Sequence, residues 1–576
     1  KKQLALRVLS TAALMAMVSS IATAAFAGTY YLEDGDITVD AKEDGNHITQ
    51  GALYQDHLDE GKTIITDHED KTNTSAVSNT VTINVEDNAT GDVTIEDAKI
   101  EPEGAKDDSG KYKGGITVDT KGENAKANIT LDNVNVKNDT GSALEVKGKG
   151  DTEIELNGDN TLIGGYFHAG LEKADDVSQG SLTIKDDKNN NGSDKKKDED
   201  GDIGTLVAAG GCNGAGIGGR MNYYEQGETD TTCTSTSNIT ITGGQIKAGS
   251  LDETVKEYPD TRQDGAGIGG AASYGNATNI TITGNADVTA AGGIYSAGIG
   301  GGDYGSATNI TISGNAKVTA AGAGSGGAGI GGGDFGTGSV LITDHADVTA
   351  YGGNQGAGIG GGASCGGSVE ISGNAKVTAV GANGSAGIGT GYHNAMVKPD
   401  REDIKVTISE NADVTAVGSY EGAAIGNGAY CWQGKTTINI TGGTVTAIGG
   451  KKLTSAIGGS RNFEDPDKAQ DVTVTINGTT GNTTVNASCW GDQKSAISTG
   501  NGAADIIGYD EDGKSPFGED GSVIVRMYNH GSYTKGNRII SRYDGDVTSY
   551  SLGNLYQVVH NRKYMKEHPE IVDDIN

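Results

Sequence analysis

Apolar residues alternate with polar or small residues in short runs that recur along most of the chain. Within one repeat the runs NITI (309–312), KVTA (317–320) and AGI (328–330) each fit a short strand, and Gly-rich or Asn-rich turns separate them. No helical periodicity lies between these runs. The pattern therefore predicts three short strands in each repeat.

The isoleucine of the motif AGIGG marks the repeat. Successive copies from Ile268 to Ile388 are 31, 31, 29 and 29 residues apart. A near-fixed period of this size indicates stacked supersecondary units, so three strands per period predict an all-β parallel β-helix of stacked coils. The copies lie at Ile217, Ile268, Ile299, Ile330, Ile359 and Ile388, with degraded copies at Ile425 and Ile457. The side chains expected to face inward are Ile310, Ile312, Val318 and Ala320.

Two columns of polar residues follow from stacking, because equivalent residues of successive coils lie roughly 4.8 Å apart. One column alternates in charge, which favours a register device, since a shifted pairing would bring like charges together. It contains Asp287, Lys317, Asp347, Lys376 and Asp413. The second column predicts a structural asparagine ladder in a left-handed turn conformation. It contains Asn285, Asn315, His345, Asn374 and Asn411.

Aromatic residues follow the landmark isoleucines by four to six positions, although only 5% of the residues are aromatic. They are Tyr223, Tyr274, Tyr304, Phe335, Tyr392, Tyr430 and Phe463, and only the copy at Cys365 lacks one. Such a column predicts either a site where rings stack on the sugars of a polysaccharide or an internal ladder that closes the turn. Polar or aromatic neighbours able to bind sugar hydroxyls are Asp303, Asp334, Asn222 and Trp432.

Two further motifs have weaker meanings. GAGIGG at 327–332 fits the dinucleotide fingerprint, but it recurs in several copies and no helix follows, so we interpret it as tight packing of small residues. Residues 187–198 copy the start of a calcium loop, although Lys195 to Lys197 bring positive charge close to the ion, and a solvated loop is the alternative. The candidate calcium ligands are Asp187, Asn189 and Asn191.

Composition and charge narrow the function. The chain has 95 Gly and 6 Pro among 576 residues, and 77 acidic against 44 basic residues give a net charge of −33. An acidic surface of this kind repels phosphate backbones, so nucleic acid is not expected as a partner. Candidate catalytic groups are few. Where acidic residues recur on neighbouring coils, Lys317 or Lys376 lies between them and offsets their charge. His393 and His530 have no evident partner, and no nucleophile elbow is present.

The chain divides by composition into four parts. Residues 1–27 have a basic start, an apolar stretch and the triplet Ala25 to Ala27, which predicts a secretory signal peptide, no membrane insertion after its cleavage, and a secreted or cell-surface protein. The other parts are irregular β-helix coils at 28–210, regular coils at 211–500, and a cap or truncated tail with a short helix at 501–576. A disulfide between Cys212 and Cys233 is left open.

The repeated GAGIGGG, the run NITISGNAKVTAAG and the earlier GSLTI resemble secreted bacterial surface proteins described as containing carbohydrate-binding domains. These belong to the wider right-handed β-helix, pectin-lyase-like group, and the resemblance covers roughly residues 90 to 500. It implies a right-handed coil and glycan binding, without motif residues to carry over. The N-T-D and G-H-G triplets of polygalacturonases are absent, which disfavours an enzyme.

The sequence therefore predicts a non-catalytic β-helix that binds polysaccharide in an adhesin-like role, without a required cofactor. A β-helical polysaccharide lyase or glycoside hydrolase is one alternative. A surface spacer or protein-binding adhesin is the other. The sequence leaves the glycan, the anchoring mode and the oligomeric state open.

Overall fold

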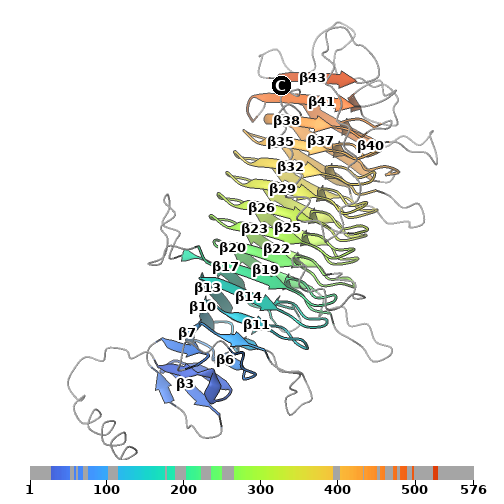
Figure 1. The fold of residues 1–576 in the computed structure, drawn as a ribbon. Helices are drawn as coiled ribbons and strands as arrows, with labels where there is room; N and C mark the ends of the chain where they lie inside the picture. The colour runs from blue at the N-terminus through green and yellow to red at the C-terminus, as the bar shows by residue number, and fades with distance from the viewer. Residues whose placement is uncertain are drawn as a thin grey trace, which may run out of the picture.

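The computed structural model shows an elongated body in which strands of successive coils stack along one axis, from the N-terminal blue end to the red strand β43 (Val523–Asn529) (Figure 1). The described residues are 28–51, 57–59, 62–68, 75–101, 115–175, 178–187, 203–221, 235–249, 265–322, 324–392, 403–431, 434–450, 454–460, 471–476, 480–489, 496–498 and 523–529. The predicted signal peptide and the predicted C-terminal helix lie outside these residues.

Within the described residues the strands form three long sheets, which we name A, B and C. Sheet A has 14 strands: β1 (Thr29–Tyr31), β5 (Thr63–Thr66), β7 (Thr90–Glu96), β10 (Lys126–Asp132), β13 (Asp151–Asn157), β16 (Leu182–Lys185), β19 (Thr236–Ile241), β22 (Ala277–Ile282), β25 (Ala307–Ile312), β28 (Gly338–Ile342), β31 (Gly367–Ile371), β34 (Ile404–Ile408), β37 (Lys435–Ile440) and β40 (Asp471–Ile476).

Sheet B has 16 strands in the described part of the chain: β4 (His57–Asp59), β3 (Gly45–Gln50), β2 (Ile37–Lys42), β6 (Val81–Val85), β9 (Ile116–Thr120), β12 (Leu144–Gly148), β15 (Leu171–Glu172), β18 (Ile217–Gly218), β21 (Ile268–Gly269), β24 (Ile299–Gly300), β27 (Ile330–Gly331), β30 (Ile359–Gly360), β33 (Ile388–Gly389), β36 (Ile425–Gly426), β39 (Ile457–Gly458) and β42 (Ile497–Ser498).

Sheet C has 13 strands among the same residues: β8 (Lys99–Ile100), β11 (Asn135–Lys137), β14 (Asp159–Ile163), β17 (Thr205–Ala209), β20 (Gln245–Gly249), β23 (Asp287–Ala291), β26 (Lys317–Ala321), β29 (Asp347–Tyr351), β32 (Lys376–Val380), β35 (Asp413–Val417), β38 (Gly443–Ile448), β41 (Thr483–Cys489) and β43.

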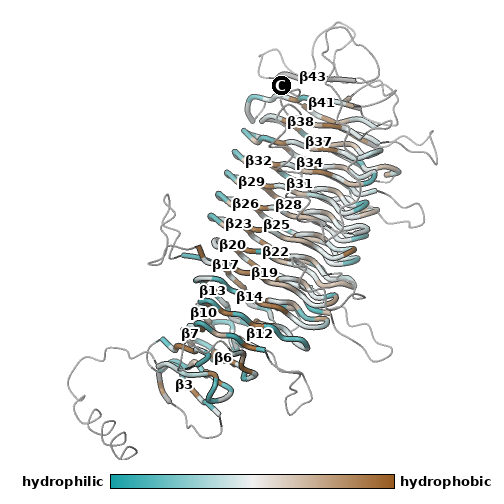
Figure 2. Tube along the Cα trace, viewed as in Figure 1, coloured by the Kyte–Doolittle hydropathy of each residue, from teal (hydrophilic) through white to brown (hydrophobic). Residues whose placement is uncertain are grey.

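Each regular coil gives one strand to each sheet, as the three-strand repeat predicts. The landmark isoleucines pair in register, with Ile299 opposite Ile330 and Ile330 opposite Ile359 in parallel strands. The alternating pattern recurs from coil to coil (Figure 2), and its apolar members form one continuous core along the axis. The side chains predicted to face inward, Ile310, Ile312, Val318 and Ala320, are all buried.

Glycine is required where sheet B turns. Gly331 has φ +134°, and a Cβ there would lie 1.9 Å from the carbonyl oxygen of Gly360 in the next coil. The amide of Ala328 also donates to the carbonyl of Gly332, which folds the chain sharply around the inward-facing Ile330. This geometry supports the interpretation of GAGIGG as a packing motif.

The alternating charge column has the predicted register. Asp287, Lys317, Asp347, Lys376 and Asp413 are direct partners from one strand of sheet C to the next. Lys317 Nζ lies 2.9 Å from Asp287 Oδ2. The parallel pairing therefore places every charge in this column beside a charge of opposite sign.

The asparagine ladder is present, but its predicted backbone conformation is wrong. Asn315 donates to Asn285 Oδ1 at 3.2 Å, and Asn374 Nδ2 lies 3.3 Å from His345 Nε2. The left-handed residue is the one before each ladder residue, usually a glycine, which adopts positive φ without a steric cost. These residues are Gly284, Gly314, Asp344, Gly373 and Glu410.

The first coils begin with a feature that the sequence did not indicate. Strands β2 and β3 pair in antiparallel fashion, and β3 pairs in the same way with β4. A 3-10 helix at Leu32–Asp34 precedes them, and its Leu32 is fully buried. At the other end β43 continues sheet C in parallel with β41.

Candidate functional site

Three aromatic side chains form a stack on the outside of consecutive coils, directly before strands β22, β25 and β28. The ring centroids of Tyr274 and Tyr304 are 5.1 Å apart, and those of Tyr304 and Phe335 are 5.0 Å apart with their planes inclined by 16°. Tyr274 is 55% exposed and Tyr304 is 46% exposed. We call Tyr274, Tyr304 and Phe335 the aromatic stack. The exposure of its two tyrosines excludes a purely internal ladder.

The column of rings is interrupted at the coil of Cys365, where the sequence lacks an aromatic residue, and Tyr392 in the next coil does not continue it. In the stack, each backbone amide donates a hydrogen bond to the carbonyl of the residue just before its counterpart in the next coil. The Phe335 amide donates to the Ala363 carbonyl, so the buried Ser364 is the counterpart of Phe335. The Ser364 amide donates to the Tyr392 carbonyl. Tyr392 thus lies one residue before the column and meets Tyr430 edge-on at 5.3 Å. A one-residue offset is invisible to spacing because the coils differ in length. Trp432, Tyr223, Asn222 and Phe463 lie outside the described residues.

Backbone strain marks the aromatic stack. Tyr274, Tyr304 and Phe335 have φ of +71°, +58° and +56°, a region that costs a non-glycine residue about 1–2 kcal/mol. Each ring pair returns roughly 0.5–1.5 kcal/mol. Glycine would adopt these φ values without strain, yet the three positions carry bulky aromatic side chains.

The stacking also changes how a ligand can meet the rings. Because neighbours cover both faces of Tyr304, its exposed part is the edge of the ring. A sugar therefore meets the edge of Tyr304 rather than a face of its ring. Tyr274 and Phe335 are the two ends of the stack among the described residues, and Tyr274 is the more exposed of the two tyrosines.

Acidic side chains border the aromatic stack. The carboxylate of Asp334 packs against Gly326, where a Cβ would lie 2.4 Å from Oδ1, and this buried Oδ1 has no hydrogen-bond partner. Burial raises the pKa of Asp334 to about 6, although the Phe335 amide offsets part of the effect. Burial and the charges of Asp303 and Asp334 raise the pKa of Tyr304. We call Asp303 and Asp334 the acidic border.

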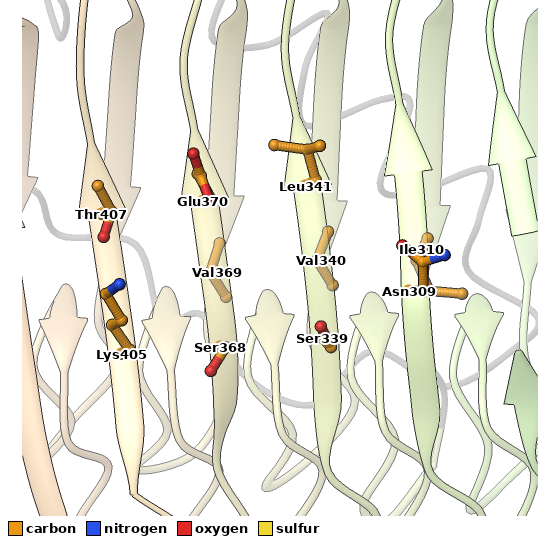
Figure 3. A pocket seen from close by; sticks show the side chains of 10 residues that line it. All are labelled: Asn309, Ile310, Ser339, Val340, Leu341, Ser368, Val369, Glu370, Lys405 and Thr407. Atoms are coloured by element: carbon orange, nitrogen blue, oxygen red, sulfur yellow. The ribbon is translucent and has the colours of Figure 1, made fainter. Parts of the chain in front are cut away.

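A shallow groove of about 280 Å³ lies on the outer face of sheet A (Figure 3). It lies where the strands shorten from six residues in β25 to five in β28, with a register shift between Ala307 and Ile310. The change of coil spacing from 31 to 29 residues is the sequence signal for this step. The lining residues are Asn309, Ile310, Ser339, Val340, Leu341, Ser368, Val369, Glu370, Lys405 and Thr407.

The shortening ends a second asparagine ladder, which the repeat pattern did not indicate. Asn309 donates to Asn279 Oδ1 at 2.8 Å, and Asn279 donates to Asn238 Oδ1 at 3.0 Å. All three asparagines have left-handed φ, and the strands after β25 have no equivalent residue. The ladder therefore ends at Asn309, at the edge of the groove.

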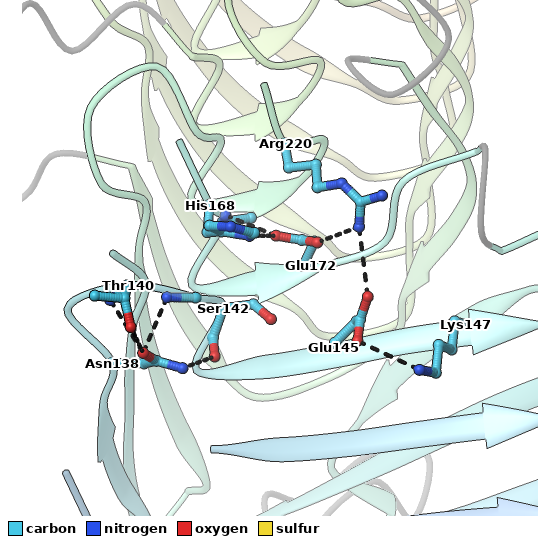
Figure 4. Close-up of polar contacts among 10 residues, drawn as sticks. Asn138, Thr140, Ser142, Glu145, Lys147, His168, Glu172 and Arg220 are labelled. Carbon is cyan, nitrogen blue, oxygen red and sulfur yellow. Dashed lines mark hydrogen bonds and ion pairs between the residues drawn. The ribbon is translucent and has the colours of Figure 1, made fainter. Parts of the chain in front are cut away.

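Two carboxylates stack on neighbouring coils of sheet B (Figure 4), although the sequence pattern indicated no such pair. Glu145 in β12 is the direct partner of Glu172 in β15. Arg220 Nη1 lies 3.4 Å from Glu145 Oε1 and 2.9 Å from Glu172 Oε1. His168 Nδ1 lies 2.8 Å from Glu172 Oε2. The irregular spacing of the early coils hides this carboxylate pair from sequence alignment.

The environment of the carboxylate pair favours a structural role. Burial and the charge of Glu172 raise the pKa of Glu145. Burial alone would raise the pKa of Glu172 as well, but His168 and Arg220 outweigh it and lower the pKa. The side chain of Glu172 is only 1% exposed and both its oxygens are engaged, so a polymer does not reach it. The cluster is suited to joining coils.

The calcium candidate is only partly described. Asp187 contacts Lys185 Nζ at 2.9 Å, which also lies 2.8 Å from Glu153, while Asn189 and Asn191 lie outside the described residues. The residues that the structure describes contain no group of three or more His, Cys, Asp or Glu side chains able to hold a metal ion. Calcium binding at residues 187–198 stays a prediction.

Comparison with known proteins identifies the repeat. Six segments match a family model described as Beta helix repeat, at residues 239–272, 280–303, 310–334, 340–363, 369–392 and 438–461. No curated protein and no solved structure gives a significant match. Together the matched repeats and the three parallel sheets define a right-handed parallel β-helix. In the described part of the chain, no helix is long and apolar enough to cross a membrane.

Proposed function

We propose that the chain is an exported, non-catalytic β-helical binding protein that holds a polysaccharide along the aromatic stack. The observation that carries the proposal is the outward stack of Tyr274, Tyr304 and Phe335 at strained backbone positions. Strained bulky residues persist where the surrounding structure or a function requires them. The predicted signal peptide at residues 1–27 supports export.

A linear polymer suits the repetition of the aromatic stack. The three rings lie on consecutive coils along the axis, so an extended chain is able to contact these coils with the same kind of weak interaction. Sugar C–H groups would contact the exposed parts of Tyr274 and Tyr304, while carboxylates bind sugar hydroxyls. The groove on sheet A supplies further hydroxyl and amide groups at Ser339, Ser368 and Asn309.

The test is binding of the purified chain to an array of polysaccharides, beside a triple variant with alanine at Tyr274, Tyr304 and Phe335. The matched control is Tyr166→Ala, which removes a tyrosine that is also about half exposed but lies outside the stack. Loss of binding in a folded triple variant, with retention in the control, supports the proposal. Retention in both variants contradicts it.

Cleavage and passive spacing are the competing functions. The carboxylate pair is the pair of stacked acids that we would test for hydrolysis, and release of new reducing or unsaturated ends that stops with Glu145→Gln would favour an enzyme. A spacer predicts that deletion of one coil, residues 300–330, leaves function intact. Binding that depends on the aromatic stack is expected from neither alternative.

A further inference from the structure

The acidic border lies beside the rings on two consecutive coils. Asp303 and Asp334 directly precede Tyr304 and Phe335, and both carboxylates act electrostatically on Tyr304. The backbone keeps them close, because the Tyr304 amide donates to the Asp334 carbonyl at 2.8 Å and the Tyr274 amide donates to the Asp303 carbonyl. Negative charge thus recurs together with the rings.

One carboxylate oxygen of Asp334 lacks a hydrogen-bond donor. Its Oδ1 is buried against the Gly326 backbone and has no hydrogen-bond partner. The Phe335 amide offsets only part of the cost of burying this carboxylate, and a cationic donor offsets such a cost better than a neutral hydroxyl does. The neighbouring rings add to the same preference, since a cation is attracted to an aromatic face.

The net charge of the whole chain also favours a cationic ligand. A net charge of −33 concentrates cations near the surface and repels polymers of uronic or sulfated sugars. Among polysaccharides, the cationic class carries free amino groups in place of N-acetyl groups. Charge complementarity therefore singles out one ligand class.

We propose that the aromatic stack and the acidic border select polysaccharides that carry protonated amino sugars. The amine lies against the carboxylate of Asp334 while the sugar body contacts the exposed edge of Tyr304 and the neighbouring ring of Phe335. This inference rests on the proposed polysaccharide-binding function and names its ligand class.

The experiment compares one glucosamine polymer in two forms, N-acetylated and de-N-acetylated, by binding to the full chain at pH 7 and low salt. We expect the amino form to bind about tenfold more tightly, with the difference reduced at high salt. Asp334→Asn should weaken binding of the amino form about tenfold more than binding of the acetylated form, which removes most of this preference. Circular dichroism establishes that each variant is folded.

The control separates a site from overall charge. Asp413→Asn removes the same charge from an exposed position on sheet C, away from the rings, and should keep the preference. Equal loss in both variants, or equal affinity of the wild-type chain for the two polymers, overturns the inference. A lysine homopolymer bound as tightly, with the same dependence on Asp334, would show that the ligand is a peptide.

The two proposals fail in different ways. Binding of the acetylated polymer that requires Tyr304 but shows no preference for amines keeps polysaccharide binding and refutes the amino-sugar inference. Failure of every polysaccharide in the array refutes both.

Discussion

Tyr304 and Phe335 lie 31 positions apart in the chain and stack with ring centroids 5.0 Å apart. Both residues have left-handed backbone conformations. One coil of the β-helix separates them, so the period of the repeat alone brings them together. The free-energy cost of each strained backbone position and the free energy gained from the ring contact are both about 1 kcal/mol, so substitutions at these positions can separate the two.

Tyr304→Gly should change the free energy of unfolding by less than about 1.5 kcal/mol, because glycine relieves the strain that the lost ring contacts had offset. Tyr304→Ala keeps the strained backbone without the ring, and should be less stable than the glycine variant by about 1 kcal/mol. Urea unfolding of both variants gives the comparison. An alanine variant as stable as the glycine variant would show that the backbone carries no strain here.

Lys317→Asp places three acids in succession in the charge column, between Asp287 and Asp347. We expect a loss of about 1 kcal/mol in stability, since these side chains are largely exposed. Lys247→Asp is the matched control, because the coils on either side have Val207 and Thr289 at its level. Equal losses, or a difference that does not shrink in 1 M salt, would contradict the charge argument.

The carboxylate pair makes stability depend on pH through His168. Burial alone would lower the pKa of His168, but Glu172 outweighs it and raises the pKa above 6.5. The stabilisation is therefore complete below about pH 6.5 and is lost as the pH rises through the raised pKa. His168→Gln should be less stable than the wild type by about 1 kcal/mol near pH 5.5, and the gap should close in alkaline solution.

Glu172 makes the stability fall at acidic pH. Its lowered pKa gives stability that is present above about pH 4.5 and is lost as the pH falls through the folded value, while the raised pKa of Glu145 acts in the opposite sense. Comparing unfolding of wild type and variant across pH isolates the histidine. His345→Asn, which introduces the asparagine found in neighbouring coils, is the control, and a pH-independent gap for His168→Gln would refute the linkage.

Lys173 is fully buried, and its Nζ has no hydrogen-bond partner. The next coils have Gly219 and Gly270 at the position of Lys173, because the backbone amides of all three residues make the same hydrogen bond to the next strand of sheet B. Burial lowers the pKa of Lys173 to about 8, so the charged form destabilises the fold below that pH, and stability should rise between about pH 8 and 10.5.

Lys173→Met removes this penalty and should stabilise the protein at pH 7 by about 1–3 kcal/mol. The variant should also lose the rise in stability between pH 8 and 10.5. The exposed Lys247→Met serves as the control. Destabilisation by Lys173→Met in urea unfolding would mean that the ammonium group is satisfied in the fold.

The sequence predicted the architecture well because the repeat encodes it locally. Alternation in NITI and KVTA defines strands, and the spacing of the isoleucines defines the coil. The same spacing aligned Asp287 with Lys317 and Tyr304 with Phe335 correctly. Where the coil length changes, the alignment slipped by one residue and placed Tyr392 in the wrong column.

The sequence by itself determined the strands, the coil period, the inward faces and the pairing of Asp287 with Lys317, since each depends on short-range periodicity. Only the tertiary structure decided that the rings face one another, that Asp334 Oδ1 is buried, that Glu145 and Glu172 share Arg220, and that a groove opens beside Leu341. These features depend on backbone angles and on contacts between coils of unequal length, and a one-dimensional pattern does not record either.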